Sequence, residues 1–273
     1  MKLNAKRGSL AKFEQDKVII SLYRPFAKRW LFFDRILNER VYQWPKISGR
    51  SIAVTEFTSE KPFMVLMTDE IADKHLVGAG ASCQCFPVSH LKDTALAQFR
   101  QYYSNDSITK DDLFHYIYAV LHHPEYRVRY AANLKRELPR IPFAPGFTTF
   151  VTAGRELARL HVEYESLEPW PLQFVEDKHV PYSERVTKMK FSPDRQSLRI
   201  NESLTLVGIP AEVFEYRLGS RSALEWVIDQ YQIKGESDPN REDDPGYIVR
   251  LVGQVVRVSV ATVQIVKSLP SYR

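Results

Sequence analysis

The chain has 273 residues, of which 44% are hydrophobic and 26% are charged, a composition typical of a globular protein with a substantial core. The sequence has no stretch of 18 or more apolar residues, and residues 1–16 are polar and charged. We therefore expect neither a membrane span nor a secretion signal. The two cysteines, Cys83 and Cys85, are too few and too close together for a disulfide framework, which favours a reduced cytoplasmic protein.

Charge is distributed unevenly along the chain. The net charge is +5, but residues 1–50 alone contain 12 Lys/Arg and 4 Asp/Glu, a net charge of +8, which leaves −3 for the remainder. A basic end on a nearly neutral body is typical of a protein to which a polyanion binds. By charge alone, an ordinary solvated basic surface explains the pattern equally well.

The first part of the chain, residues 17–90, is predicted to be rich in β-structure. Short runs of β-branched and aromatic residues, separated by turn-forming proline and glycine, predict strands at 18–23, 30–33, 51–55 and 62–67. We expect a small sheet with basic connecting loops.

Apolar residues then recur at helical spacing over residues 91–165. One helix is predicted from Leu91 to Tyr103, and a second begins after an N-cap at Thr109 and ends at Pro124. A third is predicted from Pro124 to Leu134, and a fourth over 150–161.

Residues 180–268 predict a mixture of strands and helices. Strands are expected at 186–191, 197–201 and 213–217, and a helix at 223–231. The tail over 247–268 has valines that alternate as in a strand and an apolar stripe that fits a helix, and its length favours the helix. The expected fold class is therefore α+β, with an N-terminal β-rich part, a central helical part, a second small β part and C-terminal helices. We expect residues 1–273 to form a single module.

Common catalytic signatures are missing from the sequence. It has no glycine-rich phosphate loop, no G-x-G-x-x-G, no G-x-S-x-G, and no Asn-Pro-Pro-Tyr-like tetrapeptide of a DNA adenine methylase. We predict no catalytic residues and no cofactor.

Two groups of histidines and cysteines could be taken for metal sites. Cys83 and Cys85, with His75 and His90 nearby, match zinc-site spacing poorly, so we expect buried thiols on a strand. The second group surrounds a predicted helix end, where an interaction with the helix dipole is the favoured explanation. It consists of His115, His122 and His123.

An acidic run could hold Mg²⁺ in a divergent nuclease. It contains Asp238, Glu242, Asp243 and Asp244. Nuclease carboxylates normally lie on strands or at their ends, whereas this run lies in a proline-containing loop, where acids favour turns and cap the next helix. We predict no metal site.

Four stretches, in order, carry a family resemblance. They are residues 23–34, which begin Tyr-Arg-Pro-Phe; Cys85-Phe-Pro at 85–87; residues 112–127, continued by 129–131 and 138–142; and residues 222–231, followed by 238–240 and 247–250. These stretches resemble the C-terminal target-recognition domain of type ISP restriction–modification enzymes, and the resemblance as a whole runs from about residue 17 to 270. Residues 234–238 are shorter than the corresponding family segment, which leaves the geometry of an adjacent contact loop in doubt.

The resemblance implies sequence-specific recognition of double-stranded DNA. Whole enzymes of this family join a nuclease, a helicase-like ATP-driven translocase, an N6-adenine methyltransferase and this domain in one polypeptide. The chain would then direct methylation and cleavage performed elsewhere, and we expect it to be a separated part of a larger polypeptide or a split subunit.

Basic residues near the N-terminus are the predicted DNA contacts, since phosphate contacts from Arg and Lys position a DNA reader. They are Arg24, Lys28, Arg29, Arg35, Arg40, Lys46 and Arg50. Tyr23, Pro25 and Phe26 are interpreted as packing groups that fix a turn. A third hypothesis, beside DNA recognition and the Mg²⁺-dependent nuclease, is a coupling module whose helical middle docks on a methyltransferase and exposes an apolar patch.

Overall fold

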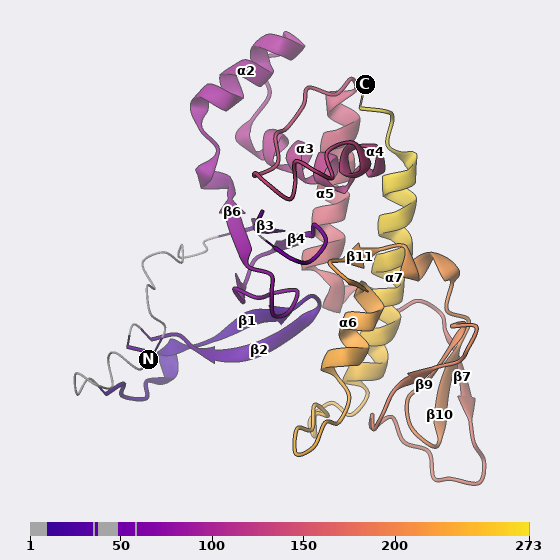
Figure 1. Cartoon of the computed structure of the whole chain (residues 1–273). Helices are drawn as coiled ribbons and strands as arrows, with labels where there is room; N and C mark the ends of the chain where they lie inside the picture. Colours follow the sequence, from indigo (N-terminus) through magenta and orange to yellow (C-terminus); the bar gives the residue numbers. More distant parts are fainter. Residues whose placement is uncertain (1–9, 35, 38–48, 58, 273) are drawn as a thin grey trace.

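The computed structural model describes residues 10–34, 36–37, 49–57 and 59–272, and these residues form a mixed α+β fold, which confirms the expected class (Figure 1). The α-helices are α2 (Asp93–Tyr103), α3 (Lys110–His122), α4 (Pro124–Arg129), α5 (Phe147–Val162), α6 (Ala223–Gln230) and α7 (Tyr247–Ser268). The short 3-10 helices are η1 (Gln15–Lys17), η3 (Val88–His90), η4 (Tyr164–Ser166) and η5 (Ala211–Phe214).

The strands of the described residues form several small sheets. The sheet with order β2-β1-β5 contains β1 (Val18–Arg24), β2 (Ala27–Phe32) and β5 (Ile71–Ala72). The sheet with order β4-β3-β6 contains β3 (Ser51–Thr55), β4 (Val65–Thr68) and β6 (Cys83–Pro87). The sheet with order β7-β10-β9-β8 contains β7 (Gln173–Glu176), β8 (Lys190–Phe191), β9 (Ser197–Arg199) and β10 (Leu204–Val207). A ribbon pairs β11 (Arg217–Leu218) with β12 (Arg221–Ser222).

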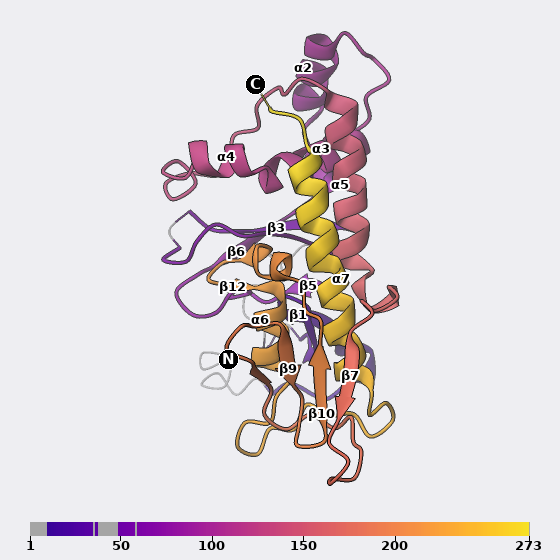
Figure 2. The ribbon, with the colours of Figure 1, turned by 90° about the vertical axis from the view of Figure 1, so that its right-hand side faces the viewer.

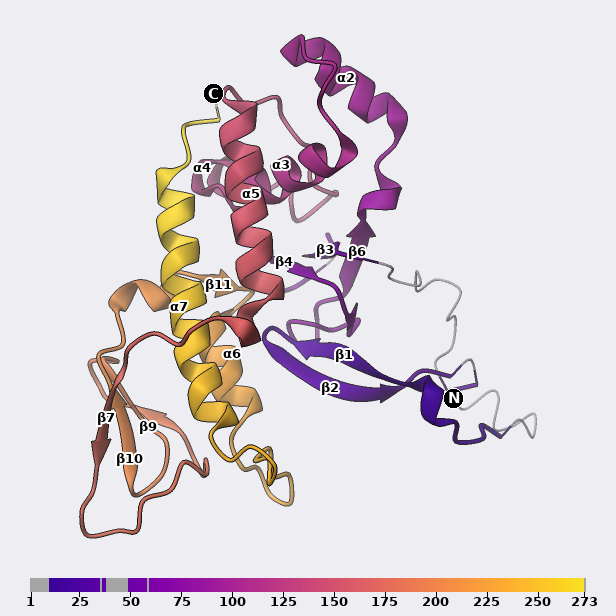
Figure 3. The ribbon, with the colours of Figure 1, turned by 180° about the vertical axis from the view of Figure 1, so that it is seen from behind.

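Two long helices, α5 and α7, lie side by side along the molecule (Figure 2). Helices α2, α3 and α4 gather at the end where the C-terminus lies (Figure 1). The β1–β2 hairpin and the β7-β10-β9-β8 sheet lie toward the other end of α7, on opposite sides of it (Figure 3). Helix α7 therefore runs from the helical part of the molecule at one end to the two β parts at the other.

Helix α7 is long and apolar enough to cross a membrane by length and composition, with a mean hydropathy of 1.5 over its most apolar window. However, 72% of that window is buried inside the protein. Its central residues Leu251, Val252, Val255 and Val256 are each 0% exposed. The apolar surface of α7 is thus accounted for by the protein core.

Several predicted elements are confirmed. Strand β3 and helix α7 have the predicted bounds. Thr109 caps α3 in a capping box with Asp112: the Asp112 N–H donates to the Thr109 hydroxyl at 3.1 Å, and the Thr109 N–H donates to the Asp112 carboxylate at 2.8 Å. Pro124 begins α4, as proline does at the first helical position.

Two predicted segments are wrong in extent or type, and two strands were missed. Helix α4 ends at Arg129 rather than Leu134, because residues 131–133 are exposed and have no apolar packing to hold a helix. The predicted strand over 213–217 is largely the 3-10 helix η5, which starts after Pro210 and buries Val213. Strands β7 and β10 were not predicted.

The predicted strand over 186–191 is limited to β8, because a side chain takes the place of a partner strand. The Asn240 side-chain amide donates to the Val186 carbonyl at 2.8 Å, and its oxygen accepts from the Val186 N–H at 2.8 Å. Both backbone groups of Val186 are thereby satisfied without a sheet ladder. Strand β9 stops at Arg199, two residues before the predicted end.

A chain of buried hydrogen bonds joins β4, α3, α5 and α7. The Met67 N–H donates to the Tyr118 hydroxyl at 2.8 Å, and that hydroxyl is hydrogen-bonded to Nδ1 of His161 at 2.6 Å. Nε2 of His161 then lies 2.9 Å from the Thr262 hydroxyl. Because His161 is buried away from water, its pKa is lowered to about 3, and the ring is neutral.

This burial predicts a pH dependence of stability. Below pH 6.5 the unfolded chain protonates His161 but the folded chain does not, so stability is fully present above pH 6.5 and is lost as pH falls from 6.5 toward 3. The loss is about 1.4 kcal/mol per pH unit for this one group. Urea unfolding between pH 7 and 5 should therefore show a shallower pH slope for His161→Gln than for the parent chain.

The matched control is His179→Gln, at an exposed position after β7. This variant should keep the parent's pH slope. An unchanged slope for His161→Gln would contradict the assignment of a neutral, buried His161.

Candidate nucleic-acid interface

The β1–β2 hairpin is held to the core by its turn. Phe26 adopts a left-handed conformation, with φ of 58°, which is strained for a residue with a side chain. Its ring is only 1% exposed and contacts the Tyr164 ring edge-on at 5.0 Å between centroids. Pro25 is also buried, so both residues act as the predicted packing groups, whereas Tyr23 is 37% exposed.

The described basic residues of this region lie on the hairpin and just before β3. The Arg24 guanidinium pairs with Asp73 at 3.3 Å and stacks on the Tyr23 ring at 3.9 Å from the centroid. Arg29 is exposed and donates to the Gln230 carbonyl at 3.2 Å. No described carboxylate lies within ion-pair distance of Arg29, so its charge is available to a partner.

Two carboxylates in the segment just after α5 pair with the other two described basic residues. Lys28 pairs with Glu165 at 2.8 Å, and Arg50 pairs with Glu163 at 2.7 Å. Burial opposes ionisation of Glu165, but hydrogen bonds from Lys28 and Tyr247 outweigh it and keep the pKa of Glu165 below its ordinary value. These partners are remote in sequence, so no sequence signal could have revealed them.

The remaining predicted contacts lie outside the described residues. They are Arg35, Arg40 and Lys46. The hairpin also exposes apolar side chains that sequence reasoning placed in a strand without assigning them to a surface. Trp30 is 74% exposed and lies directly opposite Ile20, which is 38% exposed.

The cysteines and histidines have structural roles. Cys83 and Cys85 are free, half-buried thiols on β6 that pack against the core.

The predicted interaction of the histidines with the helix dipole is wrong for His122. Burial keeps the pKa of His122 well below its ordinary value, and the uncharged ring is hydrogen-bonded to the Tyr118 carbonyl at 2.8 Å. His115 lies in the first half of α3 and bonds the Asp111 carbonyl at 2.8 Å. His123 lies 3.1 Å from the Pro270 carbonyl.

The acidic run is spread over a turn and a helix start. Asp238 accepts from the Asn240 N–H at 2.9 Å, which closes a turn, and its carboxylate pairs with Arg185. Asp244 pairs with Arg250 in the first turn of α7, whose N-cap is Gly246 without a side-chain cap, so the expected capping is wrong. In the part of the chain that the structure describes, no group of three or more His, Cys, Asp or Glu is arranged to hold a metal ion.

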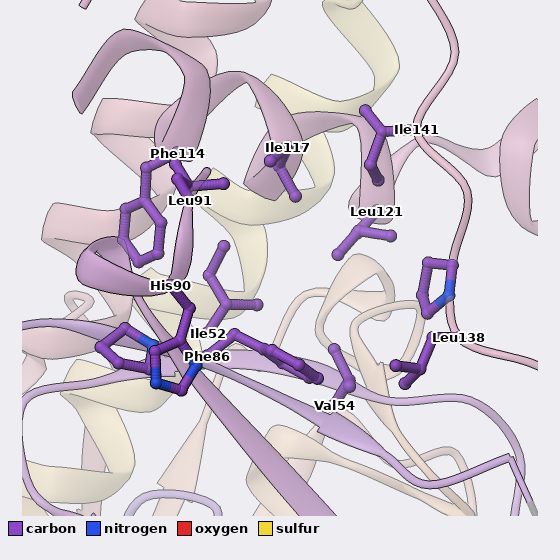
Figure 4. A pocket seen from close by; sticks show the side chains of 12 residues that line it. Ile52, Val54, Phe86, His90, Leu91, Phe114, Ile117, Leu121, Leu138 and Ile141 are labelled. Atoms are coloured by element: carbon purple, nitrogen blue, oxygen red, sulfur yellow. The ribbon is translucent and has the colours of Figure 1, made fainter. Parts of the chain in front are cut away.

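An apolar groove of about 190 Å³ opens between the β4-β3-β6 sheet and α3 (Figure 4). Its walls come from β3, β6, α3 and the segment after α4. The lining side chains include Ile52, Phe86, Phe114, Ile117, Leu138 and Ile141. Apart from His90, every lining residue is apolar, so the groove offers contact surface rather than chemistry.

Comparison with solved structures shows several similar chains, including the following three. A DrdV–DNA complex has a TM-score of 0.86 and 34% identity, covering 99% of this chain and 30% of that chain. A nuclease-deletion mutant of the Type ISP restriction–modification enzyme LlaGI, in complex with a DNA substrate mimic, has a TM-score of 0.82 and 32% identity. The match covers 100% of this chain and 26% of that chain. The ATP-dependent Type ISP restriction–modification enzyme LlaBIII bound to DNA has a TM-score of 0.85 and 25% identity. The match covers 100% of this chain and 19% of that chain. The chain thus spans less than a third of each of these relatives.

The search of curated proteins finds no match. A family model does match, over residues 1–252, and it is described as the Type ISP C-terminal specificity domain. That match covers nearly the whole fold, from the β1–β2 hairpin into α7. The chain belongs to the Type ISP C-terminal specificity domain family.

Proposed function

We propose that this domain recognises double-stranded DNA and that its N-terminal basic residues contact the phosphate backbone. The observation that carries the proposal is the DrdV–DNA complex, which is 34% identical to the chain over almost its full length. The basic residues proposed as contacts are Arg24, Lys28, Arg29, Arg35, Arg40, Lys46 and Arg50. Such contacts position a reader, while contacts to base edges provide sequence specificity.

Among the described residues of this set, Arg29 is the one without a carboxylate partner, since its guanidinium donates to a carbonyl and lies over the Tyr231 ring at 5.7 Å from the centroid. For Lys28 and Arg50, a phosphate would compete with Glu165 and Glu163. Both ion pairs are partly exposed, and such pairs contribute only about 0–1 kcal/mol to stability. Replacing the carboxylate partner by a phosphate therefore costs little free energy.

We further propose that the domain directs chemistry performed elsewhere. The partners are an N6-adenine methyltransferase, a helicase-like translocase and a nuclease on other parts of a larger polypeptide, in the cytoplasm. The support is that the similar LlaGI and LlaBIII chains are Type ISP restriction enzymes and are several times longer than this chain.

Neutralising Lys28→Gln and Arg29→Gln together should weaken binding to duplexes of any sequence. If about five phosphates are neutralised in the parent complex, log K should fall against log salt with a slope near −4 to −5. The double variant should reduce the magnitude of that slope by about 2. Fluorescence anisotropy with a labelled duplex over a salt series measures both quantities.

The control is Arg155→Gln with Arg159→Gln, which removes the same charge from two partly exposed, ion-paired arginines of α5. Its salt slope should match that of the parent. Equal losses from both pairs would mean that the hairpin is not the DNA-facing surface.

The isolated chain should show no ATP hydrolysis, methyl transfer or DNA cleavage above background when incubated with ATP, labelled S-adenosylmethionine, Mg²⁺ and plasmid. The physical reason is that the sequence has none of the phosphate-binding or base-gripping motifs these reactions use. Cleavage that survives purification and disappears in Asp243→Asn with Asp244→Asn would instead favour the nuclease.

The apolar groove favours coupling to a methyltransferase as a second role. Leu138 is 39% exposed on the groove, so Leu138→Glu changes the surface without burying a charge. This variant should weaken association with a separately supplied catalytic part by about 1–2 kcal/mol, measured by calorimetry. Val128→Glu, at an 80% exposed position outside the groove, should have no effect. If the two variants associate with the catalytic part equally well, the groove is not part of the interface.

A further inference from the structure

The β7-β10-β9-β8 sheet has two chemically different faces. Strand register places Phe191, Leu198 and Leu206 side by side on one face, and Leu198 and Leu206 are fully buried in the core. The other face carries Lys190, Arg199, Thr205 and Val175, which lie in one row across the four strands. This row points away from the core, since residues alternate between the two faces along each strand.

The outward face is basic and has no acid on its strands. Lys190 and Arg199 are both exposed. Lys188, two residues before β8, is also exposed. The other outward strand positions, Gln173, Ser197 and Val207, are uncharged. No described carboxylate lies within ion-pair distance of any of these three cations.

Lys190 and Arg199 are direct cross-strand neighbours, an arrangement that costs stability. Directly opposite side chains in an antiparallel pair have Cβ atoms about 5 Å apart, and like charges at that distance repel. The nearest acids in sequence lie in the turns around β9, where Asp194 already accepts hydrogen bonds from Ser192 and Gln196. A partner with closely spaced negative charges would relieve this repulsion.

We propose that this face, centred on Lys190 and Arg199, is a second DNA-binding surface that contacts the sugar–phosphate backbone. The proposal rests on the proposed function, because it takes duplex DNA as the ligand of the domain. Phosphates on one strand provide a regular row of negative charges, which complements cations on neighbouring strands. Thr205, half-exposed beside Arg199, is small enough to let a backbone approach the sheet.

The position of the sheet fits a second contact surface. It lies toward the same end of α7 as the β1–β2 hairpin, on the opposite side of that helix (Figure 3). Sequence reasoning missed it because these cations lie in a part of the chain whose net charge is negative. Only strand pairing brings Lys190 and Arg199 together.

The test compares three double variants of the 273-residue chain, each of which loses two positive charges. They are Lys190→Gln with Arg199→Gln, Lys28→Gln with Arg29→Gln, and Lys135→Gln with Arg136→Gln. Lys135 and Arg136 are exposed after α4, at the helical end of the molecule, and serve as the control. Binding to a random-sequence duplex is measured by anisotropy over a salt series.

The sheet variant should bind about tenfold or more weakly at 0.1 M salt and should reduce the magnitude of the salt slope by about 2. The control should retain the parent slope. If the sheet variant matches the control while the hairpin variant loses affinity, the second surface is refuted and the proposed function stands. If the parent chain does not bind duplex DNA at all, both proposals fail.

The single variant Lys190→Glu separates a functional role from a structural one. It replaces repulsion of Arg199 with attraction, so the melting temperature should rise by about 1–2 °C. Affinity for the duplex should nevertheless fall by about fivefold or more, since one phosphate contact becomes repulsive. A variant that gains stability and keeps full affinity would overturn the proposal.

Discussion

The burial of α7 is the constraint on which the rest of the structure depends. A 22-residue helix that is apolar on most sides has to be covered along nearly its whole length. Close packing sets the position of the segment after α5: a Cβ on Gly253 would lie 2.7 Å from the Pro169 side chain. The Gln254 side chain donates to the Glu165 and Leu167 carbonyls at 2.7 and 3.0 Å. The segment beside the basic hairpin is thus attached to the central helix.

The same segment also positions the basic hairpin through Glu165. Tyr247 at the start of α7 donates to Glu165 at 2.8 Å, and the other oxygen of Glu165 pairs with Lys28. The buried Phe26 ring holds the same hairpin from its turn, and the many contacts of a buried aromatic ring offset the cost of its left-handed backbone. The hairpin is therefore fixed at two points, which suits a surface that must present charges in a defined orientation.

Charge pairing divides the basic residues into two kinds. Cations such as Lys28 and Arg50 have carboxylate partners within the chain, so a phosphate has to displace a weak, partly exposed ion pair. Arg29, Lys190 and Arg199 have no described carboxylate partner, and two of them repel each other across a strand pair. The net charge of a segment does not make this distinction, whereas the geometry of each side chain does.

The sequence by itself determined the α+β class, the bounds of α7 and the cap at Thr109, because these depend on periodicity and local hydrogen bonding within a few residues. It also carried the family resemblance, whose motifs are linear. Only the tertiary structure decided that Asn240 would replace a strand partner for Val186, because the two residues are 54 positions apart. For the same reason the candidate site could be predicted as a basic region but not as a surface. Whether a cation is paired or free depends on partners that folding brings from distant parts of the chain.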